Sequence, residues 1–295
     1  MFLEWIYPLE KYFSALNVFR YLTFRSAYAA VTALLIAFLF GPAIIERLKV
    51  FKFGQSVRSD GPQTHLVKTG TPTMGGVFII LSVTAAVLLW VDLHNVYAWI
   101  CLLALLGCGA VGFLDDWLKI KRKNSDGISA RLKLALQGLV AVAVVALLAV
   151  NRTEYTTLLY LPFFKNPVLD LGMFYYPLAV VYIVGWSNAV NLADGLDGLA
   201  TGLTIMALIA FSIITYITGR ADWSNYLAIP FVRGAGELTV FNLALMGACV
   251  GFLWFNSHPA EVFMGDVGAL SLGGVMGVLS LIVKKEVLLF IIGGV

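Results

Sequence analysis

Long apolar segments, separated by short polar connections, dominate the sequence. A helix needs about 20 mostly apolar residues to cross the hydrocarbon core of a bilayer. Runs of this kind recur around residues 26–45, 73–91, 95–114, 132–150, 171–190, 199–218, 238–256 and 264–283. The pattern predicts an all-α fold, a polytopic membrane helix bundle with eight spans.

A ninth apolar run follows Glu286 and ends with the sequence at Val295. This run is too short to cross the hydrocarbon core of a bilayer. We therefore expect residues 1–295 to form a single integral membrane domain that is truncated at its C-terminus.

Two pairs of glycines have the four-residue spacing that lets membrane helices approach closely. Gly247 and Gly251 form one pair, and Gly273 and Gly277 form the other. Small residues at this spacing typically lie at helix–helix contacts in lipid. We expect both pairs to pack against neighbouring helices.

The composition excludes a soluble globular domain. Hydrophobic residues make up 60% of the chain and charged residues 13%, whereas soluble domains average about 25% charged residues. The cysteines Cys101, Cys108 and Cys249 lie in apolar runs and have neither metal-ligand spacing nor a disulfide pattern. The N-terminus lacks the features of a cleaved signal peptide, so we expect it to be kept.

Lysine and arginine residues concentrate in two connections between predicted spans. The connections 46–71 and 119–133 hold eleven of the 20 basic residues. Both connections lie on the same side of the bilayer, because two spans separate them. Cytoplasmic loops are enriched in Lys and Arg, so this side is predicted to be cytoplasmic. A few basic residues before the first span, together with Lys284 and Lys285, oppose this orientation.

Four polar clusters are predicted to lie on the cytoplasmic side. They are HLVKTGTPTMGG (65–76), FLDDW (113–117), NAVNLADGLDGLA (188–200) and FNSHPAEVFMGDVGAL (255–270). The outer connections, such as DLHN and TGRADWSN, show no comparable density of acids, amides and glycines. The presence of all four clusters on one side predicts a shared site there.

Two adjacent carboxylates, Asp115 and Asp116, directly follow an apolar run. A charge in a membrane span costs at least about 2.5 kcal/mol, so such residues are functional-site candidates. Acids at the C-terminal end of a helix also oppose the helix dipole, which argues against a merely solvated pair. Adjacent helical positions point about 100° apart, so each carboxylate can serve a different group.

The third cluster repeats a polar residue at every third position. The repeat consists of Asn188, Asn191, Asp194 and Asp197. Gly195 and Gly198 permit a break in the helix here. Irregular backbone at membrane depth is tolerated where it is buried in protein or lines a wet cavity. The cluster lacks the spacing of a calcium-binding loop.

The remaining clusters add candidates for a metal and phosphate site. Asp266 has glycines on both sides and is the best metal candidate, whereas an isolated histidine such as His258 is more often structural. Lys68 lies in a Gly- and Thr-rich segment that lacks the ending of a nucleotide P-loop. Carboxylates suit Mg²⁺, which binds one or two of them together with substrate phosphates. These residues predict phosphoryl transfer at the cytoplasmic membrane surface.

At these four motifs, the chain resembles the polyprenyl-phosphate N-acetylhexosamine-1-phosphate transferases, and within them the phospho-N-acetylmuramoyl-pentapeptide transferases. The resemblance runs from about Tyr21 to Val295 and rests on GTPTMGG, FLDDW, NAVNLADGLDGLA and FNSHPAEVFMGDVGAL. It implies a Mg²⁺-dependent homodimer in the bacterial cytoplasmic (inner) membrane, with an active site that faces the cytoplasm. It also implies about ten membrane helices, of which eight to nine are present here.

The reaction implied by the resemblance moves phospho-MurNAc-pentapeptide from UDP to undecaprenyl phosphate, and gives lipid I and UMP for peptidoglycan synthesis. Asp115 and Asp116 match the paired catalytic acids, and Asp266 matches the catalytic magnesium ligand. Positions that line the family's nucleotide pocket match Lys68, Asn191, Asp194, Gly195, Asp197, Asn256 and Phe263. Among these, Phe263 would stack on uracil. The implied partners are UDP-MurNAc-pentapeptide, undecaprenyl phosphate, membrane lipids and a second copy of the chain, with no nucleic acid.

Two other functions stay open on the sequence. In the first, the donor is UDP-N-acetylglucosamine, because the histidine-rich segment associated with the muramoyl-pentapeptide enzymes lies beyond Val295. The second is an ion-coupled transporter, which would carry polar groups near mid-membrane in several helices. The separate roles of Asp115 and Asp116 also stay open, as does the choice between direct attack and a covalent intermediate.

Overall fold

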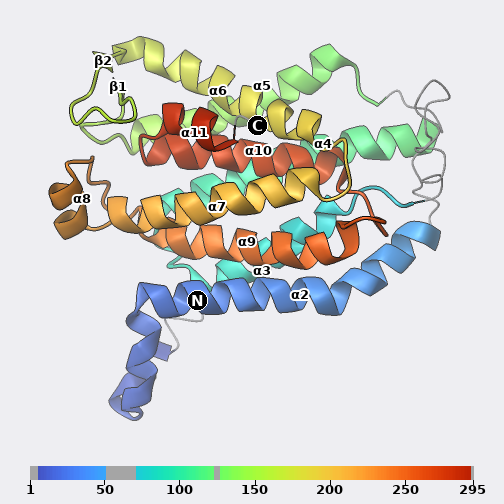
Figure 1. Ribbon diagram of the computed structural model, residues 1–295, viewed down its shortest axis with the longest axis horizontal. Coiled ribbons are helices and arrows are strands. Elements are labelled where there is room, and N and C mark those ends of the chain that lie inside the picture. The colour runs from blue at the N-terminus through green and yellow to red at the C-terminus, as the bar shows by residue number, and fades with distance from the viewer. Residues whose placement is uncertain (1–5, 51–70, 123–126, 294–295) are drawn as a thin grey trace.

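The computed structural model describes residues 6–50, 71–122 and 127–293, and it is helical throughout its membrane-spanning part (Figure 1). Seven helices in these ranges are long and apolar enough to cross a membrane. They are α2 (Leu22–Val50), α4 (Val96–Arg122), α5 (Ala130–Val150), α6 (Tyr175–Ala193), α7 (Leu199–Thr218), α9 (Glu237–Asn256) and α10 (Gly265–Ile282). The prediction of an all-α, polytopic membrane bundle is confirmed.

Shorter elements complete the described part of the chain. The shorter α-helices are α3 (Gly76–Trp90), α8 (Ala221–Leu227) and α11 (Glu286–Gly293). The 3-10 helices are η1 (Tyr7–Lys11), η2 (Ser14–Arg20) and η4 (Gly172–Phe174). Strands β1 (Leu158–Leu159) and β2 (Leu169–Asp170) form one antiparallel pair.

Helix α3 is shorter than the span predicted at residues 73–91. Its 15 residues cover about 22 Å, less than the roughly 30 Å of a hydrocarbon core. The preceding backbone is not helical because it pairs with the segment that precedes α10. The Phe263 N–H donates to the Pro72 carbonyl at 2.8 Å, and the Gly75 N–H donates to the Phe263 carbonyl at 2.8 Å.

Helix α10 is the centre of the bundle, and every residue from Val267 to Ile282 is buried. It packs against α4, α6 and α3, while α9 packs against α2, α7 and α3. Helices α2, α5 and α6 bury far fewer of their residues, so they present apolar surface to lipid. Figure 1 shows the long helices side by side along the long axis of the molecule.

The predicted glycine contacts are present in the bundle. A Cβ atom on Gly247 would lie 2.1 Å from the Ala30 carbonyl oxygen, and one on Gly273 would lie 2.2 Å from that of Trp186. Gly251 and Gly277 also face neighbouring helices, at slightly greater distances. The glycines therefore allow α9 to approach α2 and α10 to approach α6 at backbone distance.

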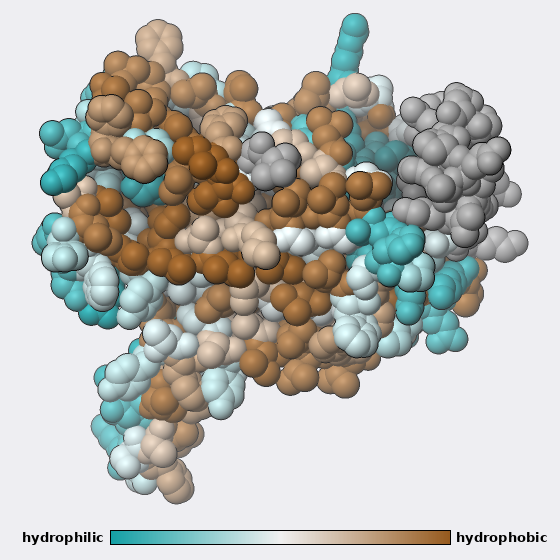
Figure 2. Space-filling model, viewed as in Figure 1, coloured by the Kyte–Doolittle hydropathy of each residue, from teal (hydrophilic) through white to brown (hydrophobic). Residues whose placement is uncertain are grey.

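The two ends of the bundle differ as the loop pattern predicted. In Figure 1 the described parts of the four polar clusters lie at the right-hand end, and α8 and the β1–β2 hairpin lie at the left-hand end. Figure 2 shows apolar surface across the helices, with hydrophilic residues gathered toward both ends. We call the two ends the cluster end and the opposite end.

A buried ion pair at the opposite end accounts for one of the basic residues that opposed the predicted orientation. The ammonium of Lys284 contacts the Glu286 carboxylate and donates to the Tyr175 hydroxyl at 2.8 Å. Burial lowers the pKa of Lys284, and the Glu286 carboxylate opposes this shift. Because Lys284 is paired within the protein, it is a poor guide to which side of the bilayer this end occupies.

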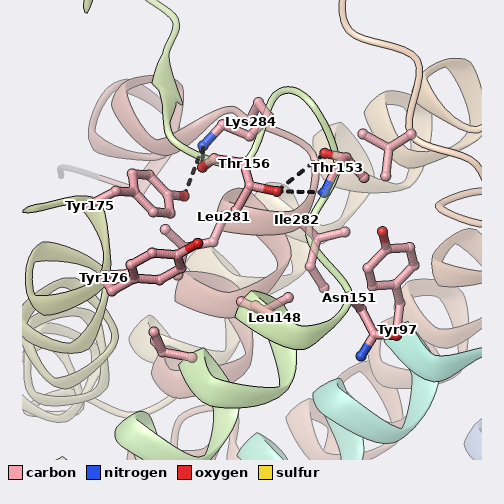
Figure 3. Close-up of a pocket in the computed structure, with 13 residues that line it drawn as sticks. Tyr97, Leu148, Asn151, Thr153, Thr156, Tyr175, Tyr176, Leu281, Ile282 and Lys284 are labelled. Carbon is pink, nitrogen blue, oxygen red and sulfur yellow. Dashed lines mark hydrogen bonds between the residues drawn. The ribbon is translucent and has the colours of Figure 1, made fainter. Parts of the chain in front are cut away.

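A small cavity adjoins this ion pair, as Figure 3 shows. Its volume of about 30 Å³ is enough for about two water molecules. Tyr97, Asn151, Thr156, Tyr175 and Lys284 lie among its lining residues. Hydroxyl and amide groups line part of the cavity, and apolar side chains such as Val145 and Leu148 line the rest.

We predict that Gly247→Ala lowers the melting temperature by several degrees, equivalent to about 1–3 kcal/mol. The added methyl group would overlap the Ala30 carbonyl and force α9 away from α2. Gly185→Ala is the matched control, because a Cβ atom there meets nothing within 4 Å. Thermal unfolding of both purified variants in detergent, followed by tryptophan fluorescence, tests the prediction, and equal melting temperatures would contradict it.

Candidate active site

Backbone contacts between helices bring the described part of the first polar cluster together with the second and fourth at the cluster end of the bundle. A Cβ atom on Gly112 would lie 2.2 Å from the Asp266 carbonyl oxygen, so α4 touches the start of α10. A Cβ atom on Gly76 would lie 2.1 Å from the Gly268 nitrogen, so α3 touches α10 one half-turn later. Neither contact leaves room for a side chain. The predicted convergence of these segments is therefore a property of the fold.

Three carboxylates meet where α4 and α10 touch. Asp115, Asp116 and Asp266 each offer an oxygen atom within 4.8 Å of the others. Asp115 and Asp116 are buried, with 3% of each residue exposed. Helix α4 continues to Arg122, so the paired acids lie inside the helix and not at its end as the apolar run suggested. We call these three residues the carboxylate cluster.

The two adjacent acids point to different neighbours, as their helical spacing predicts. The Asp115 carboxylate accepts a hydrogen bond from the Ile128 N–H at 2.8 Å, in the connection before α5. The Asp116 carboxylate accepts one from the Val267 N–H at 3.3 Å, in the first turn of α10. Each carboxylate is thereby fixed by a backbone donor from a different element.

Two lysines offset part of the charge of the carboxylate cluster. The Lys119 ammonium lies 2.5 Å from an Asp115 oxygen and 3.0 Å from an Asp266 oxygen. The Lys133 ammonium lies 2.5 Å from the same Asp266 oxygen. Opposite charges at these distances offset much of the repulsion between the acids.

Neither lysine is among the predicted site residues. In the sequence both belong to the basic connection 119–133, which serves only to predict the orientation in the membrane. A signal for Lys119 was present, since it follows Asp115 by four positions and Asp116 by three, the spacing of facing residues on a helix. Lys133 lies in the first turn of α5, which Ser129 caps by accepting from the Leu132 N–H. Its approach to Asp266 depends on how α5 packs, which the sequence does not reveal.

The break predicted between the fifth and sixth spans occurs between α6 and α7. Helix α6 ends at Ala193, α7 begins at Leu199, and Gly198 has a φ of 74°, a conformation that favours glycine. The Asn256 side chain accepts from the Gly198 N–H at 3.1 Å and donates to the Val262 carbonyl at 2.9 Å. This amide therefore joins the α6–α7 break to the segment before α10.

The break carries several of the predicted nucleotide-pocket residues. Asn191 is partly buried in the last turn of α6, and Gly195 is exposed in the turn itself. An Asp197 oxygen lies 3.1 Å from the His258 ring nitrogen Nδ1, which joins the third cluster to the fourth. Phe263 pairs its backbone with the strand-like segment before α3. Lys68 lies outside the described residues.

Asp194 caps the C-terminal end of α6 and lies close enough to the carboxylate cluster to feel its charge. Burial raises the pKa of Asp194 to about 7, and the negative charges of Asp266, Asp116 and Asp197 contribute to the rise. The helix dipole at a C-terminus also disfavours an ionised acid. The carboxyl of Asp194 thus changes its protonation state near neutral pH.

Comparisons with known proteins identify the family of the chain. The chain matches the family described as glycosyl transferase family 4 over residues 98–284. Residues 68–80 match phospho-N-acetylmuramoyl-pentapeptide-transferase signature 1. The phospho-N-acetylmuramoyl-pentapeptide-transferase of Thermodesulfovibrio yellowstonii is 51% identical, over 100% of this chain and 82% of the relative. The protein of the same name from Citrifermentans bemidjiense is 50% identical, over 98% of this chain and 81% of the relative.

This chain belongs to the phospho-N-acetylmuramoyl-pentapeptide-transferase family. It is a phosphosugar transferase and a multi-pass membrane protein. The family match over residues 98–284 contains the whole carboxylate cluster. The signature over residues 68–80 contains the backbone that pairs with the segment before α10 and the close contact at Gly76.

We predict that Asp194→Asn raises the melting temperature above pH 7 in metal-free buffer. A carboxyl whose pKa is raised by folding binds its proton more tightly in the folded state. The folded state of the parent protein therefore loses stability as the pH rises from about 4 to about 7. The amide introduced by the substitution does not titrate, so the variant should gain several degrees relative to the parent at pH 8 and nearly nothing at pH 4.

Melting temperatures of both proteins between pH 4 and pH 8, in detergent with EDTA, provide the measurement. Asp222→Asn is a suitable control, because the pKa of the exposed Asp222 is lowered by its hydrogen bond to Arg220. A difference between Asp194→Asn and its parent that stays constant with pH would contradict the prediction.

Proposed function

We propose that the protein transfers phospho-MurNAc-pentapeptide from UDP-MurNAc-pentapeptide to undecaprenyl phosphate, in a Mg²⁺-dependent reaction of peptidoglycan synthesis. The observation that carries the proposal is the carboxylate cluster, paired with two lysines, in a member of this transferase family. The products are lipid I and UMP. The oxygen of the acceptor phosphate forms a bond to the β-phosphorus, and the bond between that phosphorus and UMP breaks.

The carboxylate cluster fits a magnesium ion by its chemistry. Mg²⁺ prefers oxygen ligands and binds few carboxylates together with substrate phosphates. Three carboxylates converge here at the water-facing end of the membrane helices, and Asp266 is the proposed magnesium ligand. When bound, Mg²⁺ would neutralise charge on the UDP diphosphate and on the departing UMP.

The two remaining acids are proposed to act on the acceptor. A phosphate monoester has a second pKa near 6, so it is largely dianionic at neutral pH and needs no obligatory base. Asp115 and Asp116 face different neighbours, which supports separate roles for them. One would orient the lipid phosphate for in-line attack, and the other would help to hold the metal or remove a residual proton.

The α6–α7 break and the segment before α10 are proposed to bind the nucleotide. Their side chains lie at the cluster end, and Asn256 joins the two segments. The proposed contacts come from Asn191, Asp194, Gly195, Asp197, Asn256 and Phe263, with Lys68 as a further cation. Phe263 would stack on uracil. Lys119 and Lys133 add positive charge beside the diphosphate.

We further propose that the protein lies in the bacterial inner membrane with its cluster end toward the cytoplasm. The concentration of Lys and Arg in the sequence segments 46–71 and 119–133 supports this orientation. The cytoplasmic origin of a UDP-linked donor requires the same orientation. The family resemblance is the basis for proposing a single membrane domain and a homodimer.

The proposed function is tested with the purified full chain in detergent, Mg²⁺, undecaprenyl phosphate and one UDP-sugar at a time. UMP release from UDP-MurNAc-pentapeptide, with little release from UDP-N-acetylglucosamine, is the expected result. The reverse preference would identify the alternative transferase. Release of no UMP from either donor would contradict the proposed function.

We predict that Asp266→Asn lowers Mg²⁺-dependent turnover by at least about a thousandfold, since a charged ligand to the ion is lost. Binding of Mn²⁺ to this variant, measured by electron paramagnetic resonance, should weaken in parallel. Asp222→Asn, at the opposite end of the bundle, is the control and should bind Mn²⁺ as the parent does. Substantial turnover by Asp266→Asn would refute the assignment.

We predict that no phosphorylated enzyme accumulates when the protein meets UDP-MurNAc-pentapeptide labelled in the β-phosphate without acceptor. Direct attack by the lipid phosphate requires no covalent enzyme intermediate. Denaturing gels of the quenched mixture report any label on the protein. A labelled band that disappears on addition of undecaprenyl phosphate would show an aspartyl-phosphate route instead.

A further inference from the structure

Gln137 is a buried amide in the otherwise apolar middle of α5. Only 1% of the residue is exposed. Its oxygen Oε1 accepts a hydrogen bond from Asn188 Nδ2 at 2.8 Å, whereas its nitrogen Nε2 has no hydrogen-bond partner among the described residues. A buried donor left unsatisfied costs about 1–3 kcal/mol. An unsatisfied amide of this kind lowers the stability of the helix bundle unless the N–H group donates a hydrogen bond to a ligand.

Contacts made by neighbouring residues place Gln137 about one helical turn from the level of the carboxylate cluster. Gln137 follows Lys133 by one helical turn, and Lys133 contacts Asp266 at 2.5 Å. On the neighbouring helix, the Ser187 hydroxyl donates to the Leu270 carbonyl at 2.9 Å, and Leu270 follows Asp266 by one turn. Gln137 and its partner Asn188 thus lie about 6 Å further into the membrane than Asp266.

Asn188 fixes the orientation of the Gln137 amide. Its Nδ2 group donates both to Gln137 Oε1 and, at 2.9 Å, to the Val184 carbonyl of its own helix. Because Asn188 holds the oxygen of the Gln137 amide, the Nε2 group is directed away from Asn188. The pair therefore presents an oriented N–H donor on the membrane side of the carboxylate cluster.

The position of this donor distinguishes the two substrates of the proposed reaction. A UDP-linked donor is soluble in water and reaches the site through the polar segments at the end of the bundle. A polyprenyl phosphate reaches it from the bilayer, with its apolar chain on the membrane side of the phosphate. In the most apolar part of α5 only 22% of the residues are buried, and in α6 only 28%, so both helices leave apolar side chains for contact with lipid. An N–H group at this depth suits the phosphate that arrives from lipid.

We propose that Gln137 Nε2 donates a hydrogen bond to the phosphate of the polyprenyl phosphate acceptor, and that Asn188 holds Gln137 in the orientation required. The inference rests on the proposed function and assigns Gln137 as a specificity residue for the acceptor. A phosphate oxygen accepts such a hydrogen bond strongly because it is charged. A polyprenol carries a neutral hydroxyl in place of the phosphate, and a neutral oxygen accepts a weaker hydrogen bond.

Two variants of the full chain test the proposal. Gln137→Met keeps a similar length and removes the donor, and it should weaken binding of undecaprenyl phosphate about tenfold. Gln137→Glu keeps an acceptor for Asn188 and places a carboxylate near the phosphate, so it should weaken binding more than tenfold. Binding of undecaprenol, which has no phosphate, should change less than twofold in both. The KM for the UDP-linked donor should also change less than twofold.

Asn242→Leu is the matched control. Asn242 is a buried amide of α9 with one unpartnered atom among the described residues, and its Nδ2 group contacts Thr215, away from the carboxylate cluster. This variant should bind undecaprenyl phosphate as the parent does. Melting temperatures of all variants separate a folding defect from a binding defect, and Gln137→Glu alone decides the outcome if Gln137→Met does not fold.

Unchanged binding of undecaprenyl phosphate by the Gln137 variants would overturn the proposal, and Nε2 would then hold a buried water only. Equal losses for undecaprenyl phosphate and undecaprenol would also overturn it, because the effect would not involve the phosphate. Equilibrium binding does not depend on turnover. A parent protein that binds the lipid yet releases no UMP would therefore contradict the proposed function. The binding of undecaprenyl phosphate by the Gln137 variants would still test the role of Gln137.

Discussion

The repulsion between three clustered carboxylates, two of them buried, is the constraint on which this structure depends. Asp115, Asp116 and Asp266 each offer an oxygen atom within 4.8 Å of the others, inside a helical membrane bundle. Like charges at such distances are costly where water is scarce. The fold meets the cost with the ammonium groups of Lys119 and Lys133 and with backbone N–H donors to the paired acids.

Glycines make the cluster geometrically possible. The carboxylates meet because α4 and α3 both approach the first turn of α10 at backbone distance, at Gly112 and Gly76. A methyl group at either position would separate the helices and the acids with them. The irregular segments on both sides are buried in protein or face the polar end, as nonhelical backbone at membrane depth must be. Packing and chemistry therefore depend on the same few positions.

Much of this arrangement could be predicted from the sequence. The apolar runs located every long helix, and the parity of the spans assigned Asp115, Asp194 and Asp266 to one end, because the length of a membrane helix leaves little freedom. The break after Ala193 followed from Gly195 and Gly198. These features are local, so the sequence records them directly.

The remainder depends on packing between helices. Lys133 reaches Asp266 through the placement of α5 against α10, and the pairing of residues 72–76 with 263–264 shortens α3. In the sequence, Gln137 is only a polar residue within an apolar run. Its contact with Asn188, which fixes the orientation of the amide, is visible only in the structure. Hydrophobic periodicity reports which face of a helix is buried and not which neighbour covers it.

The balance of charge in the cluster also couples the ligands of the site. Three carboxylates and two ammonium groups leave one net negative charge among the described groups, which repels a nucleotide diphosphate. A dication in the same place would reverse that sign. Affinity for the nucleotide should therefore rise with the concentration of divalent ion, and by thermodynamic reciprocity the nucleotide should tighten the hold on the ion.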